Sequence, residues 1–250
     1  ESITSNGGPA QGGAGFTSFG IGLFGRSYAG NVDASVDTLA STGQGNLGVR
    51  LLANDGDASL ESGTVSVSGN NAYGIRVTAS GAASVSAGTT STTGSAGADG
   101  VGTYFADAIL VEGGQSMTVV ADQTSASGNG AGAIVAVGNG SISIDSNSAV
   151  ATGDAVTLNG TPRFANAISA QSFAGDIDIV SGLARTEGDQ SWAIYASAAN
   201  GAIAIESETA TTSGLGARAI YANGAGGVTI VSGTASTTGG PSNLNPSDAI

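Results

Sequence analysis

Short segments in which apolar and polar residues alternate recur along the chain. The segments "GSISIDS" (140–146), "GDIDIVS" (175–181) and "GAIAIES" (201–207) each place two isoleucines two residues apart. A period of two is typical of a β-strand with one buried face. Because the spacing of an amphipathic helix does not appear, the pattern predicts an all-β protein.

A second motif shows that these strands belong to a repeat. A small residue followed by an aliphatic residue recurs nine times, at intervals of 25 to 34 residues. Each pair is followed by an alternating segment, and then by a Thr/Ser/Ala-rich segment that closes on glycine, which tolerates the positive φ of a tight turn. Each repeat therefore predicts three short strands and three turns. The nine pairs are Gly20-Ile21, Gly48-Val49, Gly74-Ile75, Ala108-Ile109, Ala133-Ile134, Ala167-Ile168, Ala193-Ile194, Ala219-Ile220 and Ala249-Ile250.

The position two residues before each aliphatic accepts aromatic, charged and polar residues, so we expect it to face solvent. Strict alternation would turn this position inward, and the small residue after it is therefore predicted to form a corner. The longer intervals come from insertions at 95–105, 154–164 and 240–247, each of which directly precedes a pair. Insertions at one place in the repeat predict loops along a single edge of a solenoid.

The predicted fold is a right-handed parallel β-helix, a single-stranded β-solenoid with three sheets and about eight coils of roughly 25 residues. We expect residues 1–14 to be an N-terminal lead-in and residues 15–250 to be a repeat array, truncated at both ends of a longer chain. In the first three coils the alternating segment has small interior residues, such as Ala58 and Ala83. These predict that the N-terminal end of the array is less stable than the isoleucine-rich remainder.

Composition and charge exclude several classes of function. The chain has no cysteine and no histidine, which excludes thiolate metal sites and nucleophiles activated by histidine. Six basic residues, all arginine, against nineteen acidic residues give a net charge of −13. Such a charge argues against binding to nucleic acid or to anionic lipid surfaces. No cofactor and no metal is expected.

The repeat resembles a known family. The recurring pattern "GI/AI-x-A … G-x-I-x-I-x-S … T-x-T-x-G", over about residues 15–250, resembles the passenger domains of bacterial autotransporter (type V secreted) proteins and related β-helical adhesins. The resemblance implies an extracellular protein displayed at the bacterial outer membrane, with a role in adhesion and virulence. It also implies that membrane attachment depends on a C-terminal outer-membrane barrel, which these 250 residues do not include.

Glycine-rich and acidic segments suggest two kinds of site. The segment "GQGNLG" (43–48) matches a dinucleotide-binding pattern, but it precedes a predicted strand instead of opening a helix, so we interpret it as a turn. Asp55, Asp57, Asp176 and Asp178 lie in or beside predicted turns. We interpret them as solvated carboxylates, and weak calcium binding at these turns stays open.

Aromatic residues give the best candidate for a ligand-binding site. Tyr195 and Tyr221 each follow an aliphatic by one position, so they should project outward on neighbouring coils, and Trp192 lies on the same edge. Such a ladder can stack on sugar rings or on partner side chains. Alternatively, the stacked rings only stabilise the sheet. Arg50 and Arg76 are expected to stack in the same way on earlier coils.

These observations favour a non-enzymatic structural or adhesive rod whose partners are glycans or proteins of a host or neighbouring cell. One alternative is a glycan-active β-helix enzyme with carboxylates in the inserted loops, for example Asp99 and Asp107. Another alternative is a subunit of an extracellular filament, because the ends of a solenoid expose strand edges that can associate end to end.

Overall fold

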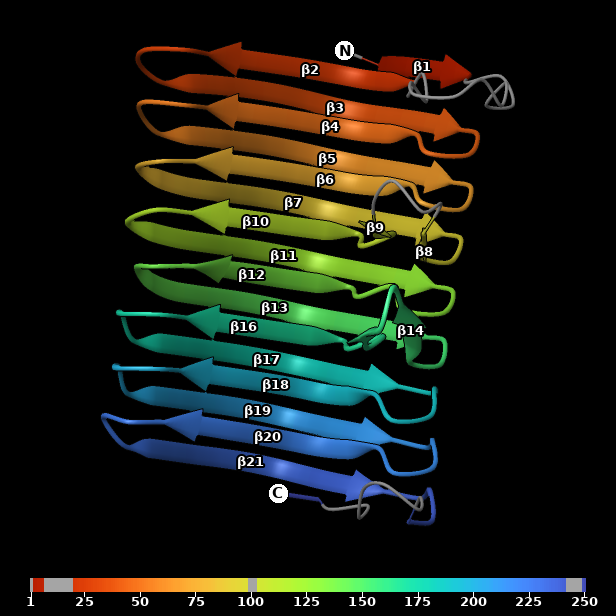
Figure 1. Cartoon of the computed structure of the whole chain (residues 1–250), viewed down its shortest axis with the longest axis vertical. Helices are drawn as coiled ribbons and strands as arrows, with labels where there is room; N and C mark the ends of the chain where they lie inside the picture. The colour runs from red at the N-terminus through yellow and green to blue at the C-terminus, as the bar shows by residue number, and fades with distance from the viewer. Residues whose placement is uncertain (1, 7–19, 99–102, 242–248) are drawn as a thin grey trace.

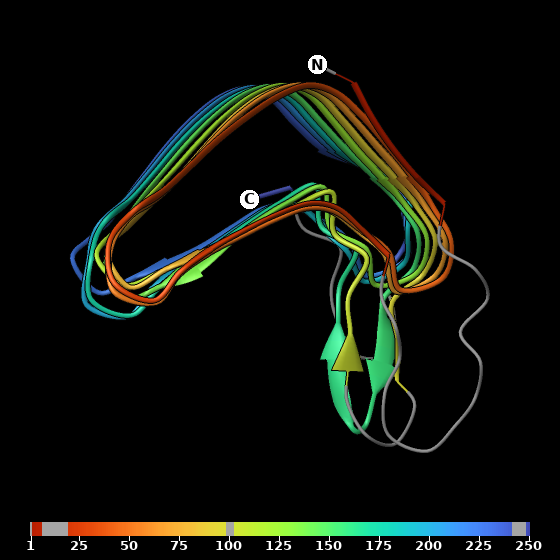
Figure 2. The ribbon, with the colours of Figure 1, turned by 90° about the horizontal axis from the view of Figure 1, so that it is seen from above.

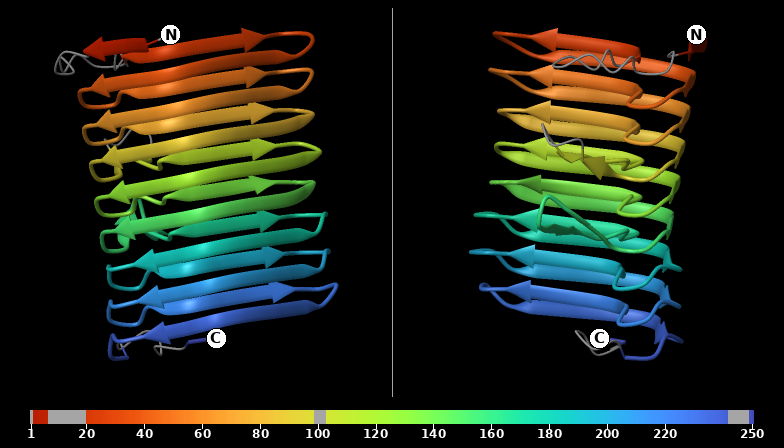
Figure 3. Two further views of the ribbon diagram at one scale, coloured as in Figure 1. Left: turned by 180° about the vertical axis from the view of Figure 1, so that it is seen from behind. Right: turned by 45° about the vertical axis from the view of Figure 1, so that its right-hand side comes forward.

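The chain forms a parallel β-solenoid of about eight coils, each of about 26 residues, as predicted. The structure is a computed structural model that describes residues 2–6, 20–98, 103–241 and 249–250. The coils lie one below another from the N-terminal to the C-terminal end, and every strand pairs with the equivalent strands of the neighbouring coils (Figures 1 and 3). The described residues contain no helix, and therefore none long and apolar enough to cross a membrane.

Two large parallel sheets build the solenoid. One sheet has eight strands of five or seven residues and is called the short-strand sheet below. The other has nine strands, most of them ten to twelve residues long, and is called the long-strand sheet. The short-strand sheet consists of β2 (Ile21–Ser27), β4 (Leu47–Ala53), β6 (Tyr73–Ala79), β10 (Ile109–Gly113), β12 (Ile134–Gly138), β16 (Ile168–Ser172), β18 (Trp192–Ala198) and β20 (Arg218–Gly224). The long-strand sheet consists of β1 (Ser2–Asn6), β3 (Val32–Thr42), β5 (Ala58–Ser68), β7 (Ala82–Thr93), β11 (Ser116–Ser127), β13 (Ser141–Thr152), β17 (Ile177–Thr186), β19 (Ile203–Thr212) and β21 (Val228–Thr237).

The second and third segments of each repeat, predicted as separate strands, form one long bent strand. The register shows the bend: β11 and β13 pair on both sides of Asp122 and Asn147, but these two residues do not pair with each other. Glycine often occupies this position. At Gly63 a Cβ atom would lie 2.4 Å from the Asp37 carbonyl oxygen, because the bend brings the two backbones together. Each coil therefore has the three predicted segments but contributes to only two hydrogen-bonded sheets.

Seen from above, the coil winds clockwise as it recedes from the viewer, which makes it right-handed (Figure 2). The long-strand sheet arches outward, whereas the short-strand sheet bends inward (Figure 2). Two antiparallel hairpins project beside the short-strand sheet. They are β8 (Gly97–Ala98) with β9 (Thr103–Tyr104), and β14 (Val156–Leu158) with β15 (Thr161–Arg163). They arise from two of the predicted insertions, and both lie on one edge of the solenoid, as expected. The third predicted insertion, 240–247, lies largely outside the described residues.

The interior consists of columns in which equivalent side chains lie in register. Ile142, Ile177, Ile203 and Val228 occupy one column, as predicted. The three isoleucines are buried, whereas Val228 is 43% exposed because its strand is the last of the sheet. Stacking therefore buries each side chain only when a coil lies on both sides of it.

The size of the interior residues in the second segment of a coil can be compared with that in the third segment of the same coil. In the coil of Ala58 the third segment carries buried Val65, whereas in the coil of Ala83 the equivalent position carries buried Thr90. In the later coils, equivalent positions of the third segment carry alanine, as at Ala149. A large aliphatic residue therefore offsets the small one in the coil of Ala58 but not in the coil of Ala83.

Two expectations about the repeat are corrected. The first small–aliphatic pair is Gly22-Leu23 instead of Gly20-Ile21, because Leu23 pairs with Val49 and Ile21 pairs with Leu47. The position two residues before the aliphatic does turn outward at a corner, but it is not solvent-exposed in most coils. Neighbouring outer side chains and the insertions cover it, so that four of these residues are at most 7% exposed: Leu47, Tyr73, Asp107 and Asn166.

Side chains in the turns bond each coil to the next. The Asp154 carboxylate accepts the backbone N–H of Asp189 at 2.9 Å, and the Asp189 carboxylate accepts that of Leu215 at 2.7 Å. Asn70, Ser95 and Asn129 make the equivalent bonds on earlier coils. Within the predicted lead-in 1–14, the described strand β1 pairs with β3.

Candidate functional site

Three aromatic residues stack on the outer face of the short-strand sheet. Trp192 and Tyr195 belong to β18 and lie with ring centroids 5.0 Å apart. Tyr221, on β20, lies 5.4 Å from Tyr195 and 6.0 Å from Trp192. All three side chains are half-buried, so each keeps part of its ring surface open to solvent. The structure thus brings together the three residues that the sequence predicted to form a ladder.

The local sequence explains why these rings project outward. Strands β18 and β20 read "WAIYASA" and "RAIYANG", and their isoleucines, Ile194 and Ile220, are buried in the solenoid interior. The tyrosine after each isoleucine must therefore point to the opposite face. Because β18 and β20 are parallel and in register, the two tyrosines lie directly opposite each other.

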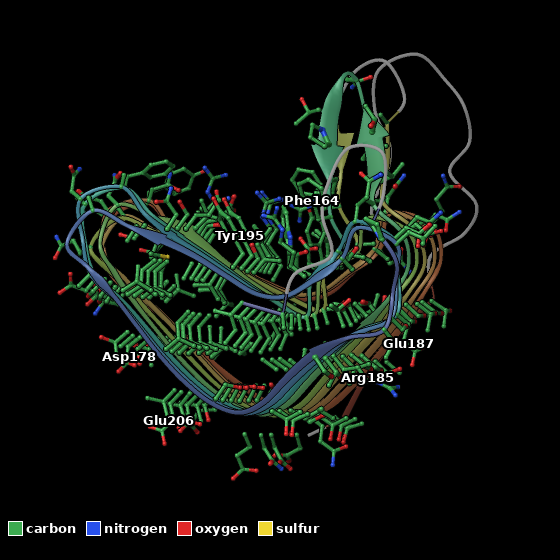
Figure 4. All side chains as sticks on the ribbon, turned by 90° about the horizontal axis from the view of Figure 1, so that it is seen from below. Phe164, Asp178, Arg185, Glu187, Tyr195 and Glu206 are labelled. Carbon is green, nitrogen blue, oxygen red and sulfur yellow. The ribbon has the colours of Figure 1, made fainter. Side chains whose placement is uncertain are left out.

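An inserted hairpin extends this aromatic surface. Phe164 follows β15, and its ring centroid lies 4.4 Å from that of Trp192 with the ring planes tilted by 48°. Tyr195 and Phe164 lie on the inward-bent side of the coil, next to the projecting hairpin (Figure 4). A shallow pocket of about 170 Å³ lies between the hairpin and the sheet. Its lining combines aromatic, amide, hydroxyl and guanidinium groups: Val135, Pro162, Arg163, Phe164, Asn166, Ser169, Gln171, Trp192 and Tyr195.

An ion pair with a buried carboxylate attaches this hairpin to the solenoid. The Arg163 guanidinium on β15 donates to the carboxylate of Asp107, which is completely buried. The second oxygen of Asp107 accepts the N–H of Gly132 at 2.8 Å. Burial raises the pKa of the Asp107 carboxyl, while Arg163 and the Gly132 N–H oppose that effect. The pair holds one wall of the pocket in place.

The same arginine also contacts the first insertion. The Arg163 guanidinium lies 4.0 Å from the ring centroid of Phe105, and this ring makes an edge contact with Tyr73. Burial raises the pKa of the Tyr73 phenol above its usual range. Tyr73 belongs to a small apolar cluster on the outer face of the short-strand sheet, together with Leu110 and Val135. The two insertions are therefore fixed to the sheet and to each other.

Arginines occupy the N-terminal part of the same face. Arg50 pairs in register with Arg76 on the next coil, as the sequence predicts. Arg76 binds Glu112, which accepts from its Nε and Nη2 atoms at 3.1 Å and 2.9 Å. In the part of the chain that the structure describes, Arg50 has no carboxylate partner. Burial, followed by repulsion from Arg76 and Arg26, lowers the pKa of the Arg50 guanidinium.

The turn carboxylates have mainly structural contacts. Asp57 and Asp176 each accept a backbone N–H from the next coil, at 2.8 Å in both cases. Asp55 and Asp178 lie in or beside the same turns. Within residues 2–6, 20–98, 103–241 and 249–250, no three acidic residues lie close enough together to hold a metal ion.

The carboxylates named for an enzyme do not form a pair among the described residues. Asp107 is buried against Arg163 and has no exposed surface, so it cannot reach a substrate in this arrangement. Asp99 lies outside the described residues. The sequence did not predict that Phe164, Arg163 and Phe105 belong to the site. They lie in insertions, and the spacing of the repeat does not predict how an insertion folds. The aromatic residue at the end of each insertion, Phe105 and Phe164, was the available signal.

The chain was also compared with known proteins. No model of a protein family, no characterised protein and no solved structure matches it.

Proposed function

We propose that the protein is a non-enzymatic adhesive rod whose contact surface is the outer face of the short-strand sheet. The observation that carries the proposal is the ladder of Trp192, Tyr195 and Tyr221, with ring planes 6° to 26° apart and one side open to solvent. Aromatic rings combine a large apolar surface with little conformational entropy to lose, and they are frequent anchors in binding sites.

The surroundings of the ladder support a sugar ligand. The adjoining pocket offers the amides of Asn166 and Gln171, the hydroxyl of Ser169 and the guanidinium of Arg163. Sugar rings have apolar faces that stack on aromatic side chains and hydroxyl groups that bind such polar groups. The ladder is mounted on a hydrogen-bonded parallel sheet, so its geometry is set before any ligand arrives, and little ordering cost remains on binding.

The proposed location follows from the family that the repeat resembles. We propose that the rod is exposed at a bacterial cell surface, as an autotransporter passenger would be, and that its partners are glycans or glycoproteins of another cell. A long, regular solenoid suits this role because it holds a binding face away from its point of attachment. End-to-end association of such rods stays a prediction.

A glycan array tests the proposal. The double variant Tyr195→Ser/Tyr221→Ser should lose binding to the neutral glycans that the wild type retains, while its far-UV circular dichroism stays that of a β-solenoid. The matched control is Phe173→Ser, since Phe173 is 55% exposed but lies in a turn outside the ladder. Equal binding by the double variant and the control would show that the rings serve only to stabilise the sheet.

A further inference from the structure

Charge is divided between the two sheets. The strands of the short-strand sheet carry four arginines, Arg26, Arg50, Arg76 and Arg218, and one carboxylate, Glu112. The strands of the long-strand sheet carry one arginine, Arg185, and eight carboxylates: Asp33, Asp37, Glu61, Asp122, Asp145, Asp178, Glu206 and Glu208. Although the net charge of the protein is −13, the described strands of the short-strand sheet thus carry a single carboxylate.

Three of these arginines, Arg26, Arg50 and Arg76, lie on the first three coils and are called the arginine stack below, although only Arg50 and Arg76 pair in register. Arg50 pairs with Phe24 on one side and with Arg76 on the other. Glu112 binds Arg76 and neutralises one of the three charges. Two positive charges remain without a carboxylate in the described structure, although nineteen acidic residues were available in the sequence.

Aromatic rings accompany the arginines. The Arg26 guanidinium lies 4.2 Å from the ring centroid of Tyr28, and that of Arg76 lies 5.5 Å from the ring centroid of Tyr73. Phe24 and Tyr28 are 51% and 70% exposed. Stacking against a ring holds a guanidinium in place and leaves its N–H groups free to donate.

We propose that the arginine stack binds the carboxylate groups of an acidic polysaccharide, such as a uronic acid polymer. This inference rests on the proposed function and names the ligand class for the same face. Guanidinium groups bind carboxylates with two parallel hydrogen bonds, which gives both affinity and orientation. Arg50 and Arg76 are equivalent residues on successive coils, about 4.8 Å apart, which is close to the length of one sugar unit. Arg26 pairs with Leu52 and therefore lies diagonally across from Arg50.

The acidic remainder of the protein does not prevent this binding. The two sheets lie on opposite sides of the coil (Figure 2), with backbones about 10 Å apart, and their exposed charged side chains project away from each other. The path through solvent between them is therefore longer than the Debye length, which is about 8 Å at physiological ionic strength. The field at the arginine stack is therefore set mainly by its own residues. Nucleic acid fits less well, since binding it depends on many phosphate contacts and on a strongly positive surface.

The test compares immobilised polygalacturonate with its methyl ester, in which each carboxylate is replaced by an uncharged ester group. The double variant Arg26→Gln/Arg50→Gln should bind polygalacturonate at least about tenfold more weakly than the wild type. Arg185→Gln, in which the arginine removed belongs to the long-strand sheet, is the matched control and should bind like the wild type. The affinity of the wild type should fall as salt concentration rises, and binding to the methyl ester should be weak in every variant.

The outcomes separate this inference from the proposed function. Equal binding of polygalacturonate by the double variant and by Arg185→Gln would overturn the inference. Loss of neutral glycans in Tyr195→Ser/Tyr221→Ser, without any binding of polygalacturonate, would leave the proposed function intact and overturn the inference. Self-association that is abolished by Arg26→Gln/Arg50→Gln, again without binding of polygalacturonate, would assign the stack to a second copy of the chain and also overturn it. Thermal unfolding of each variant checks that the solenoid is preserved.

Discussion

Tyr195 and Tyr221 lie face to face on successive coils, with ring centroids 5.4 Å apart and ring planes within 6° of parallel. Trp192 lies against both rings and is the single tryptophan of the chain. Its fluorescence therefore reports directly on the ladder.

Replacing Tyr195 by serine should expose the Trp192 indole and shift its emission to longer wavelength. The loss of two ring contacts should also lower the free energy of unfolding by about 1–2 kcal/mol. Fluorescence spectra and denaturant titration measure the two effects. The control is Tyr28→Ser, since Tyr28 is 70% exposed and lies on a distant coil. It should change neither the emission nor the free energy of unfolding. An unshifted emission in Tyr195→Ser would show that the Tyr195 ring does not cover the indole.

Removing Arg163 should destabilise the protein, because it leaves the buried Asp107 carboxylate without its counterion. We expect Arg163→Met to lower the free energy of unfolding by about 3 kcal/mol, the usual result of breaking a buried ion pair. In the double variant Arg163→Met/Asp107→Asn, part of the lost free energy of unfolding should be recovered, since no buried charge remains. Chemical denaturation measures all three variants, and a double variant no better than Arg163→Met would contradict the explanation.

Asp107 should also make stability depend on pH. Burial raises its pKa, so the folded protein holds the proton more tightly than the unfolded chain does. The contribution of Asp107 to the free energy of unfolding is therefore highest at acidic pH. This contribution is lost as the pH rises through the pKa of the folded state. Wild-type stability should fall more steeply with rising pH than that of Asp107→Asn. Parallel curves for the two proteins would show that Asp107 does not titrate in this way.

Serines in the interior offer a route to a more stable protein. Ser146, Ser181 and Ser207 form a buried column, and their hydroxyl oxygens have no hydrogen-bond partner in the described structure. Ser146→Ala should raise the free energy of unfolding by about 1 kcal/mol, since a buried polar group without a partner is costly. Ser143→Ala, at an exposed position of the same strand, is the control and should have little effect.

Hydrogen exchange should reveal how stability is distributed along the rod. The sequence alone predicts weaker protection over residues 20–95 than beyond residue 135. Packing restricts the predicted weakness to two coils. In the first coil Gly25 occupies the interior position that Leu51 fills on the next coil, and in the coil of Ala83 the interior position of Val65 is taken by Thr90. We expect amides of β4 and β5 to exchange as slowly as those of β13 to β19, and amides of β2 and β7 to exchange faster. Rapid exchange throughout β4 and β5 as well would support weaker protection over all of residues 20–95.

The solenoid could be predicted because its causes are local and repeated. Alternating isoleucines define the inward face, and the spacing of the repeat sets which residues stack, so the ladder of Tyr195 and Tyr221 followed from counting. The first pair was misplaced because Gly20-Ile21 and Gly22-Leu23 both fit the motif, and only strand pairing distinguishes them.

The wall of the pocket could not be predicted in the same way. Asp107 and Arg163 are 56 residues apart, and they meet because two insertions fold against one face of the sheet. The spacing of the repeat does not predict how either insertion packs against the sheet. For the same reason Tyr73 was expected to be exposed, although Phe105 from the first insertion packs against it.

The division of charge between the two sheets gives the rod an electric dipole across its long axis. Near a surface rich in negative charge, such as one coated with acidic polysaccharide, this dipole produces a torque that turns the arginine-bearing face toward the surface before contact is made. The rod then reaches its target with the arginine-bearing face already turned toward it, so a larger fraction of encounters leads to binding than for a rod in random orientation. The alignment weakens as salt shortens the Debye length, so the association rate should depend on ionic strength more steeply than the dissociation rate.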